Sequence, residues 1–292
     1  MAMKSTKIMA IINLSPDSFS GDGIANQKQL VERLKTAIAA GADILDIGGQ
    51  STRPGAEVID AAEEIRRVVP AIQAAQWLID LPISVDTFKA PVAAAALEHG
   101  ATIINDIQGG SDADLVKLVA QAGAEIVVMH SRGTPQTMAS LTDYPRGVIP
   151  ELLDFFRERT EQLMAGFGIA REKIIIDPGI GFAKTAAQSF EVTQRLAELQ
   201  SLGFPILYGA SQKSFLGWAL TTDPAQQAPV TERTTGTTTT TVFAMLQGAD
   251  IIRVHDVKAA VQARRVLQCI ADPVVREQVG PGHAPQSQKV IQ

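Results

Sequence analysis

The 292-residue chain has few of the features that mark a secreted, membrane or nucleic-acid-binding protein. Its single cysteine, Cys269, cannot form an internal disulfide or a cysteine cluster for a metal, so a reducing compartment is expected. No apolar stretch approaches the roughly 20 residues that cross a bilayer. The 26 basic residues form no dense block and are outnumbered by 31 acidic ones. Neither a nucleic acid nor an anionic membrane is therefore an expected partner.

The N-terminal region superficially resembles a signal peptide, because an apolar run follows Lys4 and Lys7. Asn13, Pro16 and Asp17 interrupt that run before it reaches the roughly 7 to 15 residues of a signal core, and no small-x-small cleavage site follows. We therefore expect a cytoplasmic protein. No Pro-, Gly- or Ser-rich linker divides residues 1–279, which favours one domain, and the polar residues 280–292 are expected to form a disordered tail.

Eight short apolar runs predict β-strands at residues 8–12, 44–47, 83–85, 102–104, 126–129, 174–176, 206–208 and 251–254. Segments with helical periodicity lie between them. Glycines stand where these segments would end, at Gly41, Gly100, Gly123, Gly203 and Gly248. Strand and helix in alternation indicate parallel pairing, and eight such units predict a (β/α)8 TIM barrel. A doubly wound sheet is the alternative, but no GxGxxG motif follows the first run.

Two features between these elements need separate treatment. Residues 15–23 and 48–57 are long segments rich in turn residues, and after the first two strands of a barrel they are expected to be mobile loops that close over a site. Phe19 in the first of them fits closure over an aromatic substrate, or packing back on a helix. The threonine-rich stretch 234–241 is a weak helix former, but Val242, Phe243 and Leu246 continue a helical pattern and place it on a helix.

A polar residue stands at the end of nearly every expected strand. The series is Asn13, Asp46, Asp86, Asn105, His130, Asp177, Ser211 and His255, with Arg253 one inward-facing step before the last. The active site of a (β/α)8 barrel is built at this carboxyl rim. At any one position a turn-forming or capping role is an equal alternative. So many polar groups together at an apolar barrel mouth need a ligand, water or one another as partners, which predicts a binding site.

The residue types divide this rim into two halves. Amide and carboxylate edges that suit a planar heterocycle with amide or amidine groups come from Asp86, Asn105 and Asp177. Groups that suit an oxyanion such as pyrophosphate, with a shared cation, are Asn13, Arg53, Arg253 and His255. Lys213, at an expected helix start, adds positive charge, with a solvated helix residue as its alternative.

Eight motifs in order carry a further likeness: Asn13–Phe19, Asp46–Gly55, Ser84–Asp86, Asn105–Asp106, Met129–His130, Asp177–Lys184, Ser211–Ser214 and Arg253–His255. Over about residues 8–268 the chain resembles the dihydropteroate synthase family. The resemblance implies a (β/α)8 fold and the Mg²⁺-dependent condensation of 7,8-dihydropterin-6-ylmethyl diphosphate with 4-aminobenzoate, which releases diphosphate and 7,8-dihydropteroate in folate biosynthesis. It also implies a homodimer and a target of sulfonamides.

The resemblance implies roles residue by residue. The pterin would be held by Asp86, Asn105, Asp177 and Lys213. Asn13 would ligate magnesium, and the diphosphate would be held by Arg53, Arg253 and His255. The 4-aminobenzoate site would be framed by Thr52, Pro54, Phe182 and Ser214. Because the arylamine itself attacks, no protein nucleophile is needed, and the expected catalytic groups are those that face developing charge: Asp86, Asp177, Lys213, Arg253 and His255.

The chain departs from the family pattern at three positions. Gln212 replaces an arginine that would cover the pterin face, and glutamine lacks its charge, which predicts weaker pterin binding. Gln50 stands where an acidic residue is common, and Ser15 where threonine is common. The retained carboxylates, Lys213, Arg253 and His255 still predict an active enzyme.

Three other interpretations compete with a synthase. A pterin-dependent methyltransferase module with a corrinoid partner would share the pterin-binding residues, but it has no need of residues 51–54 or of paired Arg253 and His255. A non-catalytic pterin-binding protein that lost turnover through Gln212 would bind pterin without releasing diphosphate. A purely structural barrel would have a polar rim by chance.

Overall fold

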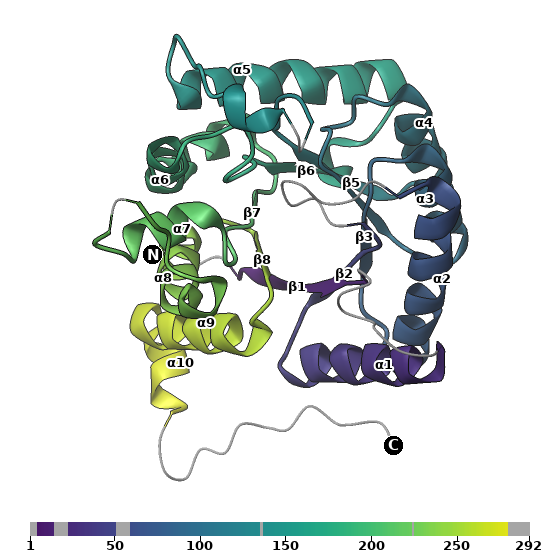
Figure 1. Cartoon of the computed structure of the whole chain (residues 1–292), viewed down its shortest axis with the longest axis horizontal. Coiled ribbons are helices and arrows are strands. Elements are labelled where there is room, and N and C mark those ends of the chain that lie inside the picture. The colour runs from purple at the N-terminus through teal and green to yellow at the C-terminus, as the bar shows by residue number, and fades with distance from the viewer. Residues whose placement is uncertain (1–4, 15–22, 51–58, 135–136, 224, 280–292) are drawn as a thin grey trace.

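The computed structural model describes residues 5–14, 23–50, 59–134, 137–223 and 225–279. Within these residues, strands occupy the centre and helices surround them (Figure 1). The strands are β1 (Lys7–Asn13), β2 (Ile44–Gly48), β3 (Ile83–Asp86), β4 (Ile103–Asp106), β5 (Glu125–Met129), β6 (Ile174–Asp177), β7 (Leu207–Tyr208) and β8 (Ile251–Val254). The α-helices are α1 (Gly23–Ala39), α2 (Ala61–Leu78), α3 (Ala90–Glu98), α4 (Ala113–Ala122), α5 (Val148–Glu161), α6 (Ala186–Gln194), α7 (Ser214–Ala219), α8 (Thr234–Leu246), α9 (Val257–Ala271) and α10 (Pro273–Glu277).

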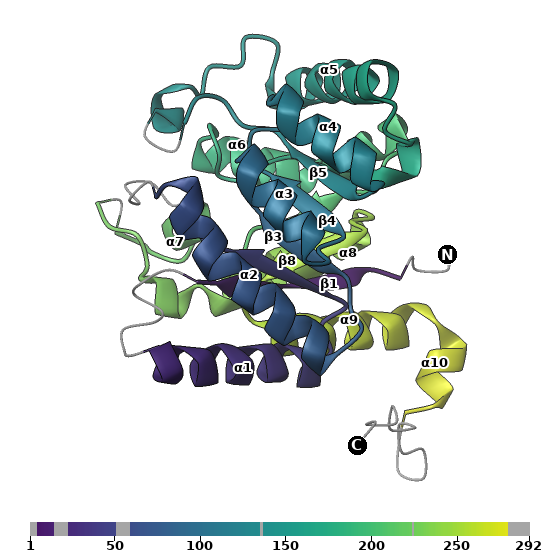
Figure 2. The ribbon, with the colours of Figure 1, turned by 90° about the vertical axis from the view of Figure 1, so that its right-hand side faces the viewer.

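All strand pairs are parallel, in the order β6-β5-β4-β3-β2-β1-β8-β7. A parallel bridge between Ile176 and Ile206 joins the two ends of this order, and the Ile176 amide donates to the Pro205 carbonyl at 2.9 Å. The sheet thus closes on itself, which confirms the predicted (β/α)8 barrel and rules out the doubly wound sheet. Helices α1 to α4 follow one another along one flank (Figure 2).

The barrel interior explains where the polar residues point. Residues from seven strands form one buried apolar layer: Met9, Ile44, Ile103, Val127, Ile175, Leu207 and Ile251. Because side chains two positions apart on a strand share a face, the residue two positions after each of these also faces inward. That rule turns Asp46, Asn105, Asp177 and Arg253 into the barrel, above the apolar layer.

The elements between the strands also follow the sequence. Gly41, Gly100, Gly123, Gly203 and Gly248 all have positive φ, the left-handed conformation that ends a helix. The threonine-rich stretch lies on α8, where the hydroxyl groups of Thr237 to Thr240 each donate to the carbonyl four residues earlier. In the part of the chain that the structure describes, no helix is long and apolar enough to cross a membrane. The predicted tail, 280–292, lies outside the described residues.

Candidate active site

The carboxyl ends of the strands open into a cavity of about 420 Å³, within the usual range for a small-molecule site. Predicted site residues that line it are Asn13, Asp86, Phe182, Ser211, Lys213, Ser214, Arg253 and His255, together with Gln50 and Gln212. Asn105 and Asp177 are buried and do not line it. Asn105 donates a hydrogen bond to the carboxylate of Asp46. Asp177 accepts the Gly179 amide at the start of the loop that carries Phe182. The fold thus brings most of the predicted site residues together at one cavity.

Arg253 joins two inward-facing carboxylates at the base of the cavity. Its Nε donates to Asp46 Oδ2 and its Nη2 to Asp86 Oδ2, both at 2.6 Å. The Asn105 amide reaches both oxygens of Asp46 at 3.4 Å. A guanidinium is a planar fork of donors, so it can hold two carboxylates at a fixed separation, which a lysine cannot do.

Asp46 corrects one detail of the sequence analysis. It does not end its strand: it is the third residue of β2, fully buried between Leu45 and Ile47, and it pairs with Arg253. The reason is that β2 continues to Gly48, so Asp46 takes an inward position below the rim. Its carboxylate stabilises the charge of Arg253. Burial disfavours the Arg253 cation, but Asp46 and Asp86 outweigh burial and raise its pKa.

Asp86 is the carboxylate best placed to meet a ligand. Burial raises the pKa of Asp86 to about 7, Arg253 opposes the rise, and Asp46 adds to it. Its Oδ1 atom is buried and has no hydrogen-bond partner among the described residues. Because an unpaired buried carboxylate oxygen is costly, this atom is suited to accept a donor from a bound ring.

Asp177 and Lys213 are two further charged groups of the site, and each affects the pKa of the other. The Asp177 Oδ1 atom accepts the Gly179 amide at 2.8 Å, which starts the loop between β6 and α6. Burial raises the pKa of Asp177, and Lys213 opposes this. Burial lowers the pKa of Lys213 to about 8, with Asp177 opposing and Arg253 assisting. Lys213 Nζ donates to the Ile180 carbonyl and lies 4.7 Å from the centre of the Phe182 ring, so it ties this loop to α7.

Lys184, to which the sequence motifs assigned no role, is buried beneath the same loop. Its Nζ lies 2.9 Å from His130 Nδ1 and donates to the carbonyls of Gly179 and Phe182 at 3.1 and 3.2 Å. His130, predicted as a rim residue, is 3% exposed and does not line the cavity. Burial lowers the pKa of both groups well below their usual values. The motif 177–184 ends on this lysine, but its sequence did not show that Lys184 folds back under its own turn.

Ser211 fixes the orientation of His255 at the ends of β7 and β8. The Ser211 hydroxyl accepts the His255 backbone amide at 3.1 Å and lies 2.9 Å from His255 Nδ1. Ser211 thus contacts both the backbone and the imidazole of His255, and His255 lines the cavity together with Arg253.

Gln212 has a left-handed backbone, with φ of 59°. The backbone amide of Gln212 donates to Thr237 Oγ1, and its backbone carbonyl accepts from Arg233 Nη1, both at 3.0 Å. The backbone at this position is thus held by α8 and Arg233, whatever its side chain is.

The residues at the rim fit the magnesium ion that the resemblance implies. Asn13 and Asp86 lie on either side of Gly48, where a Cβ would be 3.6 Å from both Asn13 Oδ1 and Asp86 Cβ. Among the described residues, no three His, Cys, Asp or Glu side chains gather as a metal site. Mg²⁺ commonly takes one or two protein oxygens and completes its shell with water and substrate phosphates. Asn13 with a neighbouring carboxylate fits such a shared ion.

Several predicted residues cannot be placed. Residues 15–22 of the first predicted mobile loop, with Ser15 and Phe19, lie outside the described residues. So do residues 51–58 of the second, with Thr52, Arg53 and Pro54.

Fold and site together define the protein as a (β/α)8 barrel with a ligand-binding site at its carboxyl rim. The buried carboxylates, amide and cations of that rim suit a flat, polar ring beside an anion. The family model for pterin binding enzymes matches residues 9–255. The chain belongs to this family.

Relatives with names agree with this assignment. The chain is 46% identical over 269 residues to a dihydropteroate synthase of Synechocystis sp., covering 91% of each chain. It superposes with a TM-score of 0.83 and 40% identity on the crystal structure of a Clostridium difficile dihydropteroate synthase determined in the presence of pteroic acid, covering 92% of this chain and 98% of the other.

Two further solved structures carry other ligands. A Yersinia pestis dihydropteroate synthase in a sulfonamide drug complex has a TM-score of 0.81, 36% identity, and coverage of 94% of this chain and 95% of the other. A Xanthomonas albilineans dihydropteroate synthase with 4-aminobenzoic acid has a TM-score of 0.82, 36% identity, and coverage of 91% and 93%.

Proposed function

We propose that this protein is a dihydropteroate synthase, a transferase that condenses 7,8-dihydropterin-6-ylmethyl diphosphate with 4-aminobenzoate to give 7,8-dihydropteroate and diphosphate. The observation that carries the proposal is the bridge from Asp46 through Arg253 to Asp86 at the base of the cavity, with Asn105 bonded to Asp46. The names of relatives at 40 to 46% identity support it. The sulfonamide complex of a relative supports this class of drug as an inhibitor.

The pterin occupies the carboxylate side of the cavity in this proposal. Asp86 and Lys213, which line the cavity, supply an acceptor and a donor for the edge of the ring. The family resemblance assigns Asn105 and Asp177, which are buried, to the same ring. Breaking the carbon–oxygen bond at the exocyclic methylene spreads positive charge into the ring, where Asp86 and Asp177 stabilise it. The arylamine attacks the methylene and loses a proton. Holding it in line, between Phe182, Ser214 and residues 52–54, supplies the advantage of proximity.

The leaving diphosphate accumulates negative charge on the other side. Arg253 and His255 line the cavity there, and Arg53 is proposed to join them. Bound magnesium, held by Asn13, would supply further charge stabilisation for the leaving group. No side chain has to form a covalent bond with substrate.

The direct test is diphosphate release from the purified protein given the pterin diphosphate and Mg²⁺, with and without 4-aminobenzoate. We expect release only with the arylamine, together with dihydropteroate. Saturable pterin binding with no release under either condition would contradict the proposal and favour a non-catalytic pterin-binding protein.

Restoring arginine at position 212 is expected to tighten pterin binding by about 0.5–2 kcal/mol, or roughly 2- to 30-fold, because a guanidinium over a ring adds a cation–π contact. The left-handed backbone is already held through its amide and carbonyl, so Gln212→Arg adds no new strain. Calorimetric titration with the pterin measures the effect. Gln212→Met, which is uncharged and of similar length, is the matched control and should show no gain. Unchanged affinity in Gln212→Arg would mean that no cation covers the ring at this position.

The activity is expected to fall as the pH rises above about 8. Burial lowers the pKa of Lys213 to about 8, so the lysine loses its positive charge above that pH. The charge-assisted hydrogen bond that the ammonium donates to the pterin is then lost as well. In Lys213→Arg the charge persists, so kcat/KM at pH 9 relative to pH 7 should be higher than in the parent, whatever the absolute rate. Parallel pH profiles of kcat/KM in the two proteins would exclude Lys213 as the titrating group.

We also propose a cytoplasmic homodimer. The single cysteine supports a reducing compartment. Apolar side chains exposed on α6, α7 and α8 support self-association: Phe190, Trp218, Phe243 and Leu246. Light scattering of the eluted protein would give twice the 31.1 kDa chain mass for a dimer.

A further inference from the structure

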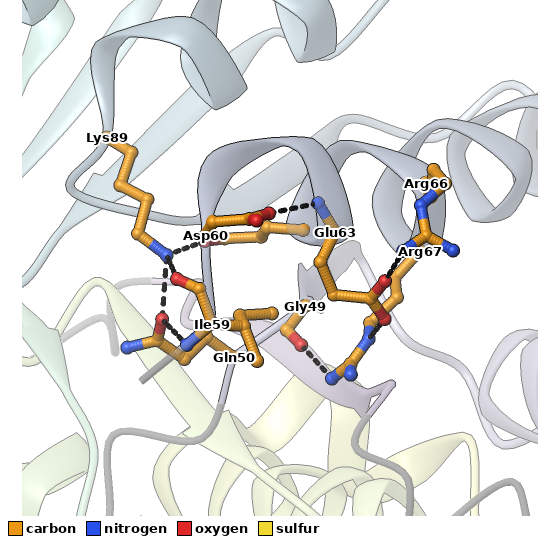
Figure 3. Close-up of polar contacts among 9 residues, drawn as sticks. Gly49, Gln50, Ile59, Asp60, Glu63, Arg66, Arg67 and Lys89 are labelled. Atoms are coloured by element: carbon orange, nitrogen blue, oxygen red, sulfur yellow. Dashed lines mark hydrogen bonds and ion pairs between the residues drawn. The ribbon is translucent and has the colours of Figure 1, made fainter. Parts of the chain in front are cut away.

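The side-chain amide of Gln50 is held by its oxygen (Figure 3). Gln50 Oε1 accepts from Lys89 Nζ at 2.7 Å and from the Ile59 backbone amide at 3.3 Å. Both partners can only donate, so the atom that meets them must be the oxygen of the amide. This settles which end of the amide is which, and Nε2 with its two N–H donors takes the other branch.

Lys89, which orients this amide, is itself fixed. It is the N-cap of α3, and its Nζ also donates to the Ile59 carbonyl at 2.7 Å and to Glu64 Oε2 at 2.6 Å. With Gln50 Oε1, these acceptors satisfy the three donors of the ammonium. Glu64 is 1% exposed and balances the charge of Lys89. Residue 50 therefore has to supply an oxygen but no charge, which an amide does as well as an acid.

The nitrogen end of the Gln50 amide is left for the cavity. Gln50 lines the active-site cavity, whereas Lys89, Ile59 and Glu64 do not. Its oxygen is thus used by residues outside the lining. None of the described residues accepts a hydrogen bond from Gln50 Nε2. The two N–H donors of Nε2 are therefore the polar groups that Gln50 can offer to a ligand.

The position of Gln50 on the rim indicates which part of a ligand it meets. Gly48, the last residue of β2, pairs in register with Asn13 on β1 and with Asp86 on β3. Gln50 follows Gly48 by two residues, after the strand has ended. It therefore lies in the same sector of the barrel as Asn13 and Asp86, the residues proposed for the magnesium and for the pterin ring.

The proposed arylamine site lies across the barrel from this sector. Phe182 and Ser214 follow β6 and β7. In the closed order of eight strands, β6 is four strands away from β2 in either direction, which is the opposite side. The 4-aminobenzoate framed by these residues is thus not the part of the ligand nearest to Gln50.

The chemistry of Nε2 suits the diphosphate of the pterin substrate. Diphosphate oxygens are acceptors only, so a group with two N–H donors and no negative charge is complementary to them, whereas a carboxylate is not. Arg253, on the same side, already gives Nε to Asp46 and Nη2 to Asp86. A further donor from residue 50 adds to what Arg253 and His255 can supply.

We propose that Gln50 is a substrate-binding residue, whose Nε2 donates to a diphosphate oxygen of the pterin substrate in an orientation fixed by Lys89. The inference rests on the proposed function, since it takes the pterin diphosphate as the substrate.

Two substitutions separate a contact with the diphosphate from support of the chain. Gln50→Glu keeps an oxygen for Lys89 and Ile59 and replaces Nε2 by an oxygen that cannot donate. Gln50→Met is of similar length and uncharged, and it removes both the donors and the oxygen. Calorimetric titration with Mg²⁺ and without 4-aminobenzoate gives the dissociation constants of two ligands: the pterin diphosphate, and 6-hydroxymethyl-7,8-dihydropterin, which has no diphosphate.

We expect Gln50→Met to bind the pterin diphosphate about tenfold more weakly, because a hydrogen bond to a charged group is lost. Gln50→Glu should lose at least as much, since its charge also repels the diphosphate. The diphosphate-free pterin should bind within twofold of the unmodified protein in both variants, because Asp86 and Asn105 are untouched.

Three results would overturn the proposal. Unchanged affinity of Gln50→Glu for the pterin diphosphate would show that only the oxygen held by Lys89 matters. Unchanged affinity of Gln50→Met would show that residue 50 acts only when it carries a charge. An equal loss of affinity for the two pterins would place the effect on the ring.

The KM for 4-aminobenzoate, at saturating pterin diphosphate, tests the side of the barrel. It should stay within twofold in Gln50→Met, and a tenfold rise there without a change in pterin diphosphate affinity would place the amide on the arylamine carboxylate and overturn the proposal. If the unmodified protein binds the pterin diphosphate but makes no dihydropteroate, the proposed function fails. The two dissociation constants then still decide whether Gln50 meets the diphosphate.

Discussion

Replacing Arg253 by methionine is expected to lower the free energy of unfolding by about 3–5 kcal/mol, because it leaves two buried carboxylates without their shared cation. Asp46 is fully buried and Asp86 is 7% exposed, and Arg253 reaches each at 2.6 Å. The pKa of Asp86, already about 7, should rise further in the variant. Urea titrations at several pH values measure the effect.

The sign of the pH dependence follows from that shift. The pKa of such a carboxyl is higher in the folded protein than in the unfolded chain. At a pH between these two pKa values, the carboxyl is protonated in the folded protein and ionised in the unfolded chain. Its stabilising contribution is therefore full at low pH and is lost as the pH rises through the folded value. The deficit of Arg253→Met should thus be smaller at pH 5 than at pH 8.

A second substitution separates this charge effect from lost packing. Arg253→Met combined with Asp46→Asn removes one of the two unpaired charges and should be more stable than Arg253→Met alone. Activity is then compared in the folded double variant, where a loss of about 10² to 10³-fold is expected because Asp86 is no longer held and the leaving group has lost a cation. A double variant no more stable than the single one would show that Arg253 stabilises the barrel by its size.

The sequence predicted the fold because two signals agreed along the whole chain. Apolar runs and helical segments alternate, and five glycines take the left-handed conformation at the positions expected for helix ends. In a barrel, the carboxyl ends of all the strands meet at one face, so knowing the strands is enough to bring Asn13, Asp86, Ser211 and His255 together. That is why the order of the residues along the chain was enough to predict that these side chains meet at one cavity.

Pairings within the site did not follow in the same way. The sequence assigned Arg253 to the anion side alone, and it gave no sign that the guanidinium also bonds Asp46 and Asp86, so that Arg253 stands between the two sides. Residues 207 positions apart share that contact, and only the closed barrel brings them together. The role of Lys184 did not follow for a related reason: it bonds backbone carbonyls, and a motif of residue types does not show where carbonyls point.

Replacing Lys184 by methionine is expected to reduce kcat about 10²-fold, because catalytic groups that move by about 1 Å lose roughly that much rate. The free energy of unfolding is expected to fall by about 2–5 kcal/mol, because two buried carbonyls lose their hydrogen-bond donor. Methionine fills similar space without donors, so the change tests the hydrogen bonds. The carbonyls of Gly179 and Phe182 lie in the loop between Asp177 and α6, and Lys184 holds both. Steady-state kinetics at low temperature, with circular dichroism to confirm folding, measures the effect. Lys117→Met, on an exposed face of α4, is the matched control and should stay within about 0.5 kcal/mol.

The loop has other anchors, which makes the outcome informative. The Asp177 carboxylate accepts the Gly179 amide at 2.8 Å, and the Tyr144 hydroxyl donates at 2.9 Å to the carbonyl of Ala183, a non-glycine residue held at φ of 47°. If those two bonds set the loop, Lys184→Met would lose stability and keep kcat. If Lys184 sets it, kcat falls even in molecules that remain folded, because Phe182 and Lys213 are packed against one another and move together. A buried lysine satisfied by a histidine and two carbonyls of one turn has little use outside that turn, so we expect the second result.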